Sequence, residues 1–156
     1  MSATSDSQEQ QDHAQGMQID VRGPQFGAAI TFAVLVVAYI WRLPFLLSFQ
    51  VLVFGIAAFA GLRWSPYGNI FRFLKRRLSF IGPPPATEPE AGPRFSQLMG
   101  FIFTAAGLAV ATNGNETVGW SLVLIVVALS ALLAFTGLCV GCEMYALGQR
   151  FRRQTQ

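Results

Sequence analysis

The chain has 156 residues, of which 12% are charged and 53% are hydrophobic. A soluble domain has about 25% charged residues, and the hydrophobic residues here stand in long runs with little polar sequence inside them. The composition therefore excludes an ordinary soluble domain and predicts an all-α membrane protein. The net charge of +3 requires no nucleic-acid partner, because basic residues beside apolar runs orient a chain in the lipid bilayer.

Residues 1–18 are rich in Ser, Gln, Asp and Glu and lack the basic start and apolar centre of a cleavable signal peptide. We expect a disordered cytoplasmic tail there. The only histidine, His13, lies in this segment, where a solvated side chain is a simpler interpretation than a metal ligand. The position of this histidine therefore disfavours a histidine-based active site.

Four apolar runs follow, at residues 26–41, 45–62, 95–112 and 120–147. A membrane-crossing helix needs about 20 apolar residues, with a tolerated range of about 17–25, so each run predicts one crossing. The first run is long enough only if Pro24 to Arg42 are included. The motif "RLP" at 42–44 separates the first two runs, and its proline suits the first turn of a new helix. The alternative is one kinked or re-entrant element over 26–62, although a helix of that length greatly exceeds one crossing.

The basic residues fall almost entirely on one side of this arrangement. The opposite side has Arg42 and the loop 113–119, which contains one acid and no base. We expect the chain to lie in the inner or plasma membrane of the cell. The positive-inside rule predicts that both termini and the central loop face the cytoplasm. The basic residues on the cytoplasmic side are Arg22, Arg63, Arg72, Lys75, Arg76, Arg77, Arg94, Arg150, Arg152 and Arg153.

Residues 65–82, between the second and third runs, have the pattern of an amphipathic helix. At about 100° per residue, Arg72, Lys75 and Arg76 lie opposite the apolar face, so we expect them to bind an anionic membrane surface. The alternative is a basic flank that only sets the topology. A stiff proline-rich linker completes the segment 65–94. The apolar face comprises Tyr67, Ile70, Phe71, Leu74, Leu78 and Ile81.

The sequence contains an internal duplication. "RGPQF" at 22–26 recurs as "AGPRF" at 91–95, and each motif opens an apolar hairpin. We therefore expect four transmembrane helices as two tandem helical hairpins, related by an axis along the membrane normal. Chance similarity between apolar sequences is the alternative. The hairpins close on the matching triads Phe59, Gly61, Leu62 and Phe135, Gly137, Leu138.

The expected organisation has five segments, with an amphipathic interfacial helix between the two hairpins. They are a tail at 1–18, a first hairpin at 19–64, the central segment at 65–94, a second hairpin at 95–147 and a basic cytoplasmic tail at 148–156.

Cys139 and Cys142 are the only cysteines, and the repeat alignment places them opposite Arg63 and Pro66. On a continuous helix their Cβ atoms would be about 5–6 Å apart, beyond the roughly 3.8 Å of a disulfide, so closing one requires a local distortion. Their position toward a helix C-terminus, beside Glu143, disfavours thiolate formation. Three roles stay open: inert packing, redox or sulfur exchange, and soft-metal binding shared with a second subunit.

Gly137 and Gly141 are spaced as a small-xxx-small seam, which predicts close helix packing with the thiols directed away from it. The sequence has no phosphate loop, catalytic triad or metal-ligand cluster. We therefore expect no cofactor, no metal site built by this chain alone and no enzyme activity of this chain on its own. A proton-coupled transporter is disfavoured, because no ionisable residue lies in the middle of an apolar run.

The segments "RGPQFGAA", "SPYGNIFR", "GPRFSQLMGFIF" and "CVGCEMY" resemble the bacterial membrane proteins grouped as domain of unknown function 4395. The resemblance covers about residues 19 to 147. It implies an uncharacterised integral membrane protein whose genes often lie near sulfurtransferase or thioredoxin-like genes, and hence a thioredoxin-like or sulfurtransferase partner.

Two functions follow as hypotheses. The first is a thiol-dependent accessory factor in sulfur or redox metabolism, with Cys139 and Cys142 as the candidate redox pair. The alternative is a non-catalytic structural or partner-recruiting membrane protein in which the cysteines are structural. A homo-oligomer is compatible with either function.

Overall fold

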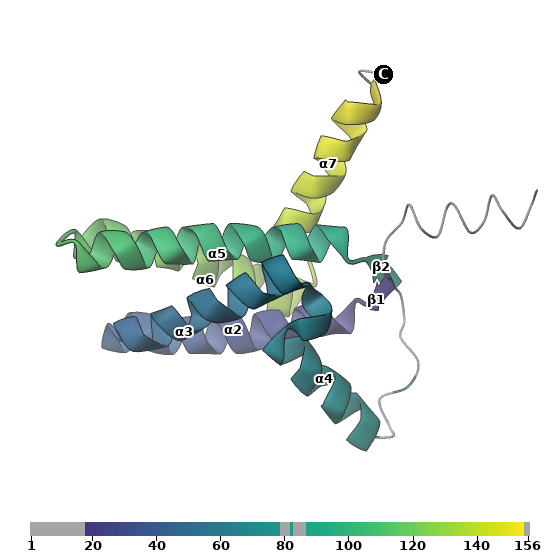
Figure 1. Ribbon diagram of the computed structural model, residues 1–156, viewed down its shortest axis with the longest axis horizontal. Coiled ribbons are helices and arrows are strands. Elements are labelled where there is room, and N and C mark those ends of the chain that lie inside the picture. Colours follow the sequence, from purple (N-terminus) through teal and green to yellow (C-terminus); the bar gives the residue numbers. More distant parts are fainter. Residues whose placement is uncertain (1–17, 79–81, 83–86, 155–156) are drawn as a thin grey trace, which may run out of the picture.

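The computed structural model describes residues 18–78, 82 and 87–154. Residues 1–17, with His13, and most of the proline-rich linker lie outside the described residues. Four apolar helices lie side by side as a bundle (Figure 1). They are α2 (Arg22–Trp41), α3 (Pro44–Gly55), α5 (Ala91–Thr112) and α6 (Glu116–Thr136).

The turn between α2 and α3 is short because each helix end is specified locally. Arg42 adopts a left-handed conformation with φ 52° and donates its backbone N–H to the carbonyl of Ala38, which ends α2. Pro44 then begins α3, where a missing N–H is tolerated. The Arg42 guanidinium lies 4.9 Å from the ring centre of Tyr39 and 5.0 Å from that of Trp120. Two separate helices therefore meet at this turn.

The fourth apolar run does not form one helix, and the expectation of a single element over 120–147 is wrong. The helix α6 ends at Thr136, and Gly137, with φ 73°, donates its N–H to the carbonyl of Leu133. A second helix, α7 (Val140–Gln154), begins after two further residues. It takes in most of the segment that was expected to be a basic tail.

The segment after α3 changes its helical winding before the amphipathic helix begins. The π-helix η1 (Ile56–Ala60) extends α3, and the 3₁₀ turn η2 (Leu62–Trp64) follows Gly61. The helix α4 (Pro66–Arg77) ends earlier than the expected residue 82.

The apolar face of α4 is only partly covered. Tyr67 and Phe71 are buried, whereas Ile70 is 48% exposed. Ile81 lies outside the described residues. Figure 1 shows α4 and α7 leaving the same end of the bundle in different directions.

A two-stranded antiparallel sheet joins the two halves at that end. The strands β1 (Gln18–Asp20) and β2 (Thr87–Pro89) pair with Ile19 opposite Glu88. The two strands are 69 positions apart, which is also the offset between the two opening motifs, 22–26 and 91–95. Each strand therefore pairs with its own counterpart, as across a two-fold axis.

The helix contacts repeat in the same way. Gln25 donates its side-chain amide to the carbonyl of Ala134 at 3.1 Å, and its counterpart Arg94 donates Nε to the carbonyl of Ala58 at 2.8 Å. These bonds satisfy carbonyls near helix C-termini, which have no partner within the helix. In addition, α2 packs on α6 as α5 packs on α3. The chain is thus built from two similar halves, α2 to α4 and α5 to α7 (Figure 1).

Apolar side chains cover much of the outside of the bundle as well as its core. The core cluster includes Leu35, Leu47 and Val123, each 0% exposed. On the outer surface, Phe45 is 83% and Phe135 76% exposed, which suits a lipid environment. Among the described residues, α2, α5 and α6 are long and apolar enough to cross a membrane. The apolar segment Pro44–Ala60 is shorter.

A buried chain of hydrogen bonds ties α4 to the bundle. Tyr67 donates its hydroxyl to Gln50 Oε1 at 2.8 Å, and Gln50 Nε2 donates to Thr31 Oγ1 at 3.3 Å. Gln50 is 0% exposed. Burial raises the pKa of the Tyr67 phenol, so the hydroxyl stays protonated and remains a donor at neutral pH.

Replacing Tyr67 with Phe is expected to lower the free energy of unfolding by about 1–3 kcal/mol, because it leaves a buried Gln50 oxygen without a donor. The matched control is Tyr145→Phe. The Tyr145 hydroxyl accepts a hydrogen bond from Gln149 at an exposed position, where water can replace the lost partner. Thermal unfolding in detergent, followed by circular dichroism, checks the pair; equal unfolding temperatures for the two variants would contradict the role of the buried chain.

Lys75, which was predicted to bind a membrane surface, forms an ion pair across the fold. Its Nζ lies 2.8 Å from Asp20 Oδ2. Burial alone would raise the pKa of Asp20, but the hydrogen bonds from Lys75 and from the backbone N–H of Arg22 outweigh it and hold that pKa below its usual value. The paired carboxylate therefore stabilises the fold above about pH 4, and this contribution is lost as the pH falls through the folded-state pKa.

Asp20→Asn is accordingly expected to destabilise the protein by about 1 kcal/mol or less at pH 7, and the difference from the unmodified chain should shrink as the pH is lowered below about 4. Unfolding temperatures measured from pH 3 to pH 8 test this. A difference that grows on acidification would have the wrong sign.

Candidate functional site

The two cysteines stand at the start of α7. Cys139 immediately precedes the first helical residue, Val140, and its sulfur accepts a hydrogen bond from the backbone N–H of Cys142 at 3.3 Å. The Cys139 carbonyl accepts the N–H of Glu143 at 3.0 Å. Cys139 is therefore the N-cap of α7, and its sulfur takes the place of the side-chain oxygen that usually caps a helix.

The cysteines form a disulfide, with their Cα atoms 5.2 Å apart. That separation lies in the ordinary range for disulfides, roughly 4.4–6.8 Å. The break at Gly137 supplies the distortion that a continuous helix would lack, because it frees Cys139 from helical geometry while Cys142 remains in the first turn.

The expectation that the cysteines lie toward a helix C-terminus is wrong. They lie at an N-terminus, where unpaired backbone N–H groups and the helix dipole favour an anion such as a thiolate. Glu143 also lies in this first turn and opposes that effect. Its side chain is exposed, so solvent screens its charge.

The structure also changes which residues of the first half correspond to the cysteines. Four residues separate Gly61 from the start of α4, whereas two separate Gly137 from the start of α7. Aligning the helix starts places Cys139 opposite Ser65, the N-cap of α4, instead of opposite Arg63. Cys142 then falls opposite Gly68 instead of Pro66.

The two glycines near the cysteines have separate roles and do not form one seam. Gly137 ends α6, and nothing lies within 4 Å of an ideal Cβ placed on it. Gly141 packs closely on α5, because a Cβ there would lie 2.7 Å from the Cβ of Ser96. A Cβ on Gly92 would lie 3.3 Å from the Cβ of Cys142. Small residues thus bring the start of α7 close against the start of α5.

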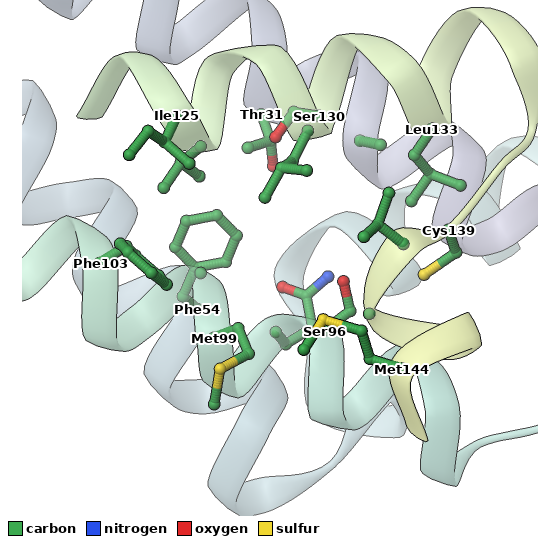
Figure 2. A pocket seen from close by; sticks show the side chains of 17 residues that line it. Thr31, Phe54, Ser96, Met99, Phe103, Ile125, Ser130, Leu133, Cys139 and Met144 are labelled. Atoms are coloured by element: carbon green, nitrogen blue, oxygen red, sulfur yellow. The ribbon is translucent and has the colours of Figure 1, made fainter. Parts of the chain in front are cut away.

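Cys139 forms one end of a partly open pocket of about 270 Å³, whose lining includes the exposed side chains of Ile125 and Leu129. Figure 2 shows its sulfur pointing into the pocket, with Phe54 and Phe103 at the other end. Sequence analysis did not identify this pocket, because its lining comes from five helices. The lining residues are Ala28, Thr31, Phe54, Ser96, Gln97, Met99, Gly100, Phe103, Ile125, Val126, Leu129, Ser130, Leu133, Cys139, Val140, Gly141 and Met144.

The predicted basic surface is only partly assembled. Arg72 and Arg76 line an open cleft with Arg63 and Trp64, and an Arg72 guanidinium nitrogen donates to the carbonyl of Arg63. Lys75 is engaged with Asp20. The cleft faces solvent and has no acidic side chain in its lining, so it presents positive charge beside an aromatic ring.

In the part of the chain that the structure describes, no group of three or more His, Cys, Asp or Glu side chains is placed to hold a metal ion. The chemistry available at the start of α7 is therefore that of two adjacent sulfurs, which can exchange between a dithiol and a disulfide.

The chain has no significant match among curated proteins or among solved structures. A family model does match residues 19–150, which include the four bundle helices, α4, α7 up to Arg150 and the cysteine pair. The chain belongs to the family described as "Domain of unknown function (DUF4395)".

Proposed function

We propose that this integral membrane protein is a thiol–disulfide exchange factor whose Cys139–Cys142 pair cycles between dithiol and disulfide at the cytoplasmic face. The observation that carries the proposal is that Cys139 is the N-cap of α7 and is bonded to Cys142. A cysteine pair at a helix N-terminus has both the geometry to close and an electrostatic environment that favours the attacking thiolate.

The membrane arrangement in this proposal has four crossings. The segment Pro44–Ala60 has 17 residues and would span about 25 Å as an α-helix, slightly less than the roughly 30 Å hydrocarbon core. Local thinning of the bilayer accommodates such a mismatch at modest cost. This segment is antiparallel to α2 (Figure 1). If it crosses the membrane, it returns the chain to the end of the bundle from which α4 and α7 extend.

Charge supports placing that end in the cytoplasm. Arg63, Arg72 and Arg76 gather there in the cleft beside α4, whereas Arg42 lies at the opposite end, in the turn before α3. The positive-inside rule then puts both termini inside. Reporter fusions after Asn113 and after Gln154 test the arrangement: the first should report outside and the second inside, and the reverse pattern would refute it.

The exchange reaction needs a soluble partner with its own dithiol, such as a thioredoxin-like protein. One partner thiolate attacks a sulfur of the Cys139–Cys142 disulfide and forms a mixed disulfide, releasing the other cysteine as a thiol. The second partner thiol then attacks the mixed disulfide. Two thiols remain on this chain, and the partner leaves oxidised.

A redox titration tests the exchange. Protein in inverted membrane vesicles is equilibrated with glutathione mixtures of increasing reducing strength, quenched with acid and labelled with a maleimide polymer that shifts gel mobility. We expect a reversible transition from no label to two labels per chain. The variant Cys139→Ser with Cys142→Ser should carry none. Cysteines that stay in one state across the whole range would refute the exchange function.

A second candidate function rests on the basic cleft, which fits an anionic lipid headgroup. Arg63, Arg72 and Arg76 supply the charge, and Trp64 is 63% exposed, as suits an aromatic residue at a membrane interface. A protein that only recruits partners to such a surface would work without its cysteines. Full activity of the double serine variant in a deletion strain would favour this second function.

A further inference from the structure

The pocket beside Cys139 has the size and lining of a ligand site that opens among lipid-facing helices. Its volume of about 270 Å³ is just below the roughly 300–1,000 Å³ of pockets for drug-sized ligands. It therefore suits a single substituted ring better than a whole lipid. Phe54, Phe103 and Ile125 make the end opposite Cys139 apolar (Figure 2).

Three polar side chains line the pocket without partners among the described residues. Ser96 and Gln97 come from α5 and Ser130 comes from α6; none of them is hydrogen-bonded to another described residue. Hydroxyl and amide groups of this kind can donate hydrogen bonds to the oxygens of a polar ligand. A hydrocarbon chain would leave them unsatisfied.

We propose that the pocket binds the ring of a membrane-soluble quinone and that the Cys139–Cys142 dithiol reduces it. This inference rests on the proposed thiol exchange and names its membrane-side substrate. A quinone matches each observation: it reaches the pocket from lipid, its carbonyl oxygens meet the three polar side chains, and its ring lies against the sulfur of Cys139. Cys142 does not line the pocket, which assigns the two sulfurs different roles.

The reaction balances as a two-electron transfer. The Cys139 thiolate adds to the bound quinone and forms a sulfur–quinone bond. The Cys142 thiolate then attacks the Cys139 sulfur, which forms the disulfide and breaks the sulfur–quinone bond, and the electron pair of that bond leaves with the ring. The two thiol protons end on the two ring oxygens. One dithiol and one quinone thus give one disulfide and one hydroquinone, and the soluble partner dithiol afterwards regenerates the thiols.

The test uses full-length protein in lipid nanodiscs, reduced and freed of reductant. The probe is a short-tailed ubiquinone analogue whose ring carries no hydrogen, so that an added thiol cannot be retained as a stable ring thioether. We expect one hydroquinone, measured by absorbance, for every two thiols lost, measured by alkylation. The double serine variant should form none.

Variants of the pocket separate binding there from reaction in bulk lipid. Ser130→Phe fills the pocket and should slow quinone reduction by about tenfold, the effect of about 1.4 kcal/mol, with its glutathione titration unchanged. The matched control is Ser121→Phe on the exposed face of the same helix, which should react at the unmodified rate. Gln97→Leu, which removes polar contacts without blocking the pocket, should raise the quinone KM.

The outcomes distinguish the two proposals. A normal glutathione transition with no quinone reduction, or with equal rates for Ser130→Phe and Ser121→Phe, would overturn the quinone site and leave thiol exchange standing. The absence of any redox transition would overturn both.

Discussion

Replacing Gly137 with valine is expected to slow alkylation of the reduced cysteine pair at pH 7 by at least about tenfold, because helix N-termini lower thiol pKa values by one unit or more. Gly137 adopts φ 73°, a conformation that disfavours a β-branched residue. Valine there favours continuing α6 through the break. Cys139 would then enter a helix interior and lose its N-cap position, with its sulfur moved away from Cys142.

The matched control for this change is Gly61→Val. Gly61 occupies the corresponding position of the first half and also has a positive φ, 97°, so valine strains the backbone there too. A Cβ on Gly61 would in addition lie 3.0 Å from Glu90 Oε1, which makes this a demanding control, and no cysteine is nearby in sequence. Iodoacetamide alkylation of the reduced proteins, followed by mass spectrometry, measures both. Equal alkylation of Gly137→Val and the unmodified protein would show that the helix start does not activate the pair.

Replacing Gly119 with alanine is expected to destabilise the protein by about 3 kcal/mol, the upper end of the usual range for overpacking. A Cβ on Gly119 would lie 2.5 Å from the backbone nitrogen of Ala111 and 2.6 Å from the carbonyl oxygen of Gly107. Backbone atoms cannot rotate away as a side chain can. The first turns of α6 would have to separate from α5, which opens the second hairpin.

Gly148→Ala is the control for this substitution. Gly148 lies in α7 with nothing within 4 Å of an ideal Cβ, so alanine there should stabilise the helix by about 0.5–1 kcal/mol. The two glycine-to-alanine changes are therefore expected to have opposite signs. Thermal unfolding in detergent measures both, and a stabilising effect of Gly119→Ala would show that the two helices do not approach this closely.

Most of the helical fold could be predicted from the apolar runs and the repeated motifs. Each run marks a helix of the bundle because long apolar segments have few other stable forms in lipid. The offset of 69 residues between "RGPQF" and "AGPRF" recurs in the pairing of β1 with β2 and in the matched bonds of Gln25 and Arg94, although neither strand was predicted. These features depend on composition and local motifs, which are readable along the chain.

The break between α6 and α7 was not predicted, because the hydropathy pattern gives no sign that Gly137 adopts a left-handed backbone conformation. The run stays apolar through Gly137, Leu138 and Val140, so its periodicity gives no stop signal. The match of Gly137 with Gly61 held the relevant information, since the first copy clearly changes direction at "GLRWSP". Applying that turn to the second copy would have ended α6 at Gly137 and started a new helix at Cys142, two residues later than the observed start at Val140.

The pocket and the ion pair could not be predicted, because each joins residues that are far apart in the sequence. Lys75 and Asp20 are 55 positions apart. Ser96 and Ser130 line the same pocket only after α5 and α6 pack beside the start of α7 (Figure 2). No local sequence pattern predicts contacts between residues so far apart in the chain.

The redox state of the pair in living cells tests the account most directly. Cells that express the protein are quenched with acid, their free thiols are blocked with a light alkylating reagent, and disulfides are then reduced and labelled with a heavy one. Peptide mass spectrometry gives the disulfide fraction at Cys139 and Cys142. The account predicts a mixture that shifts toward disulfide with a membrane-permeant oxidant and returns when the oxidant is removed. A pair that stays entirely dithiol or entirely disulfide throughout would contradict it.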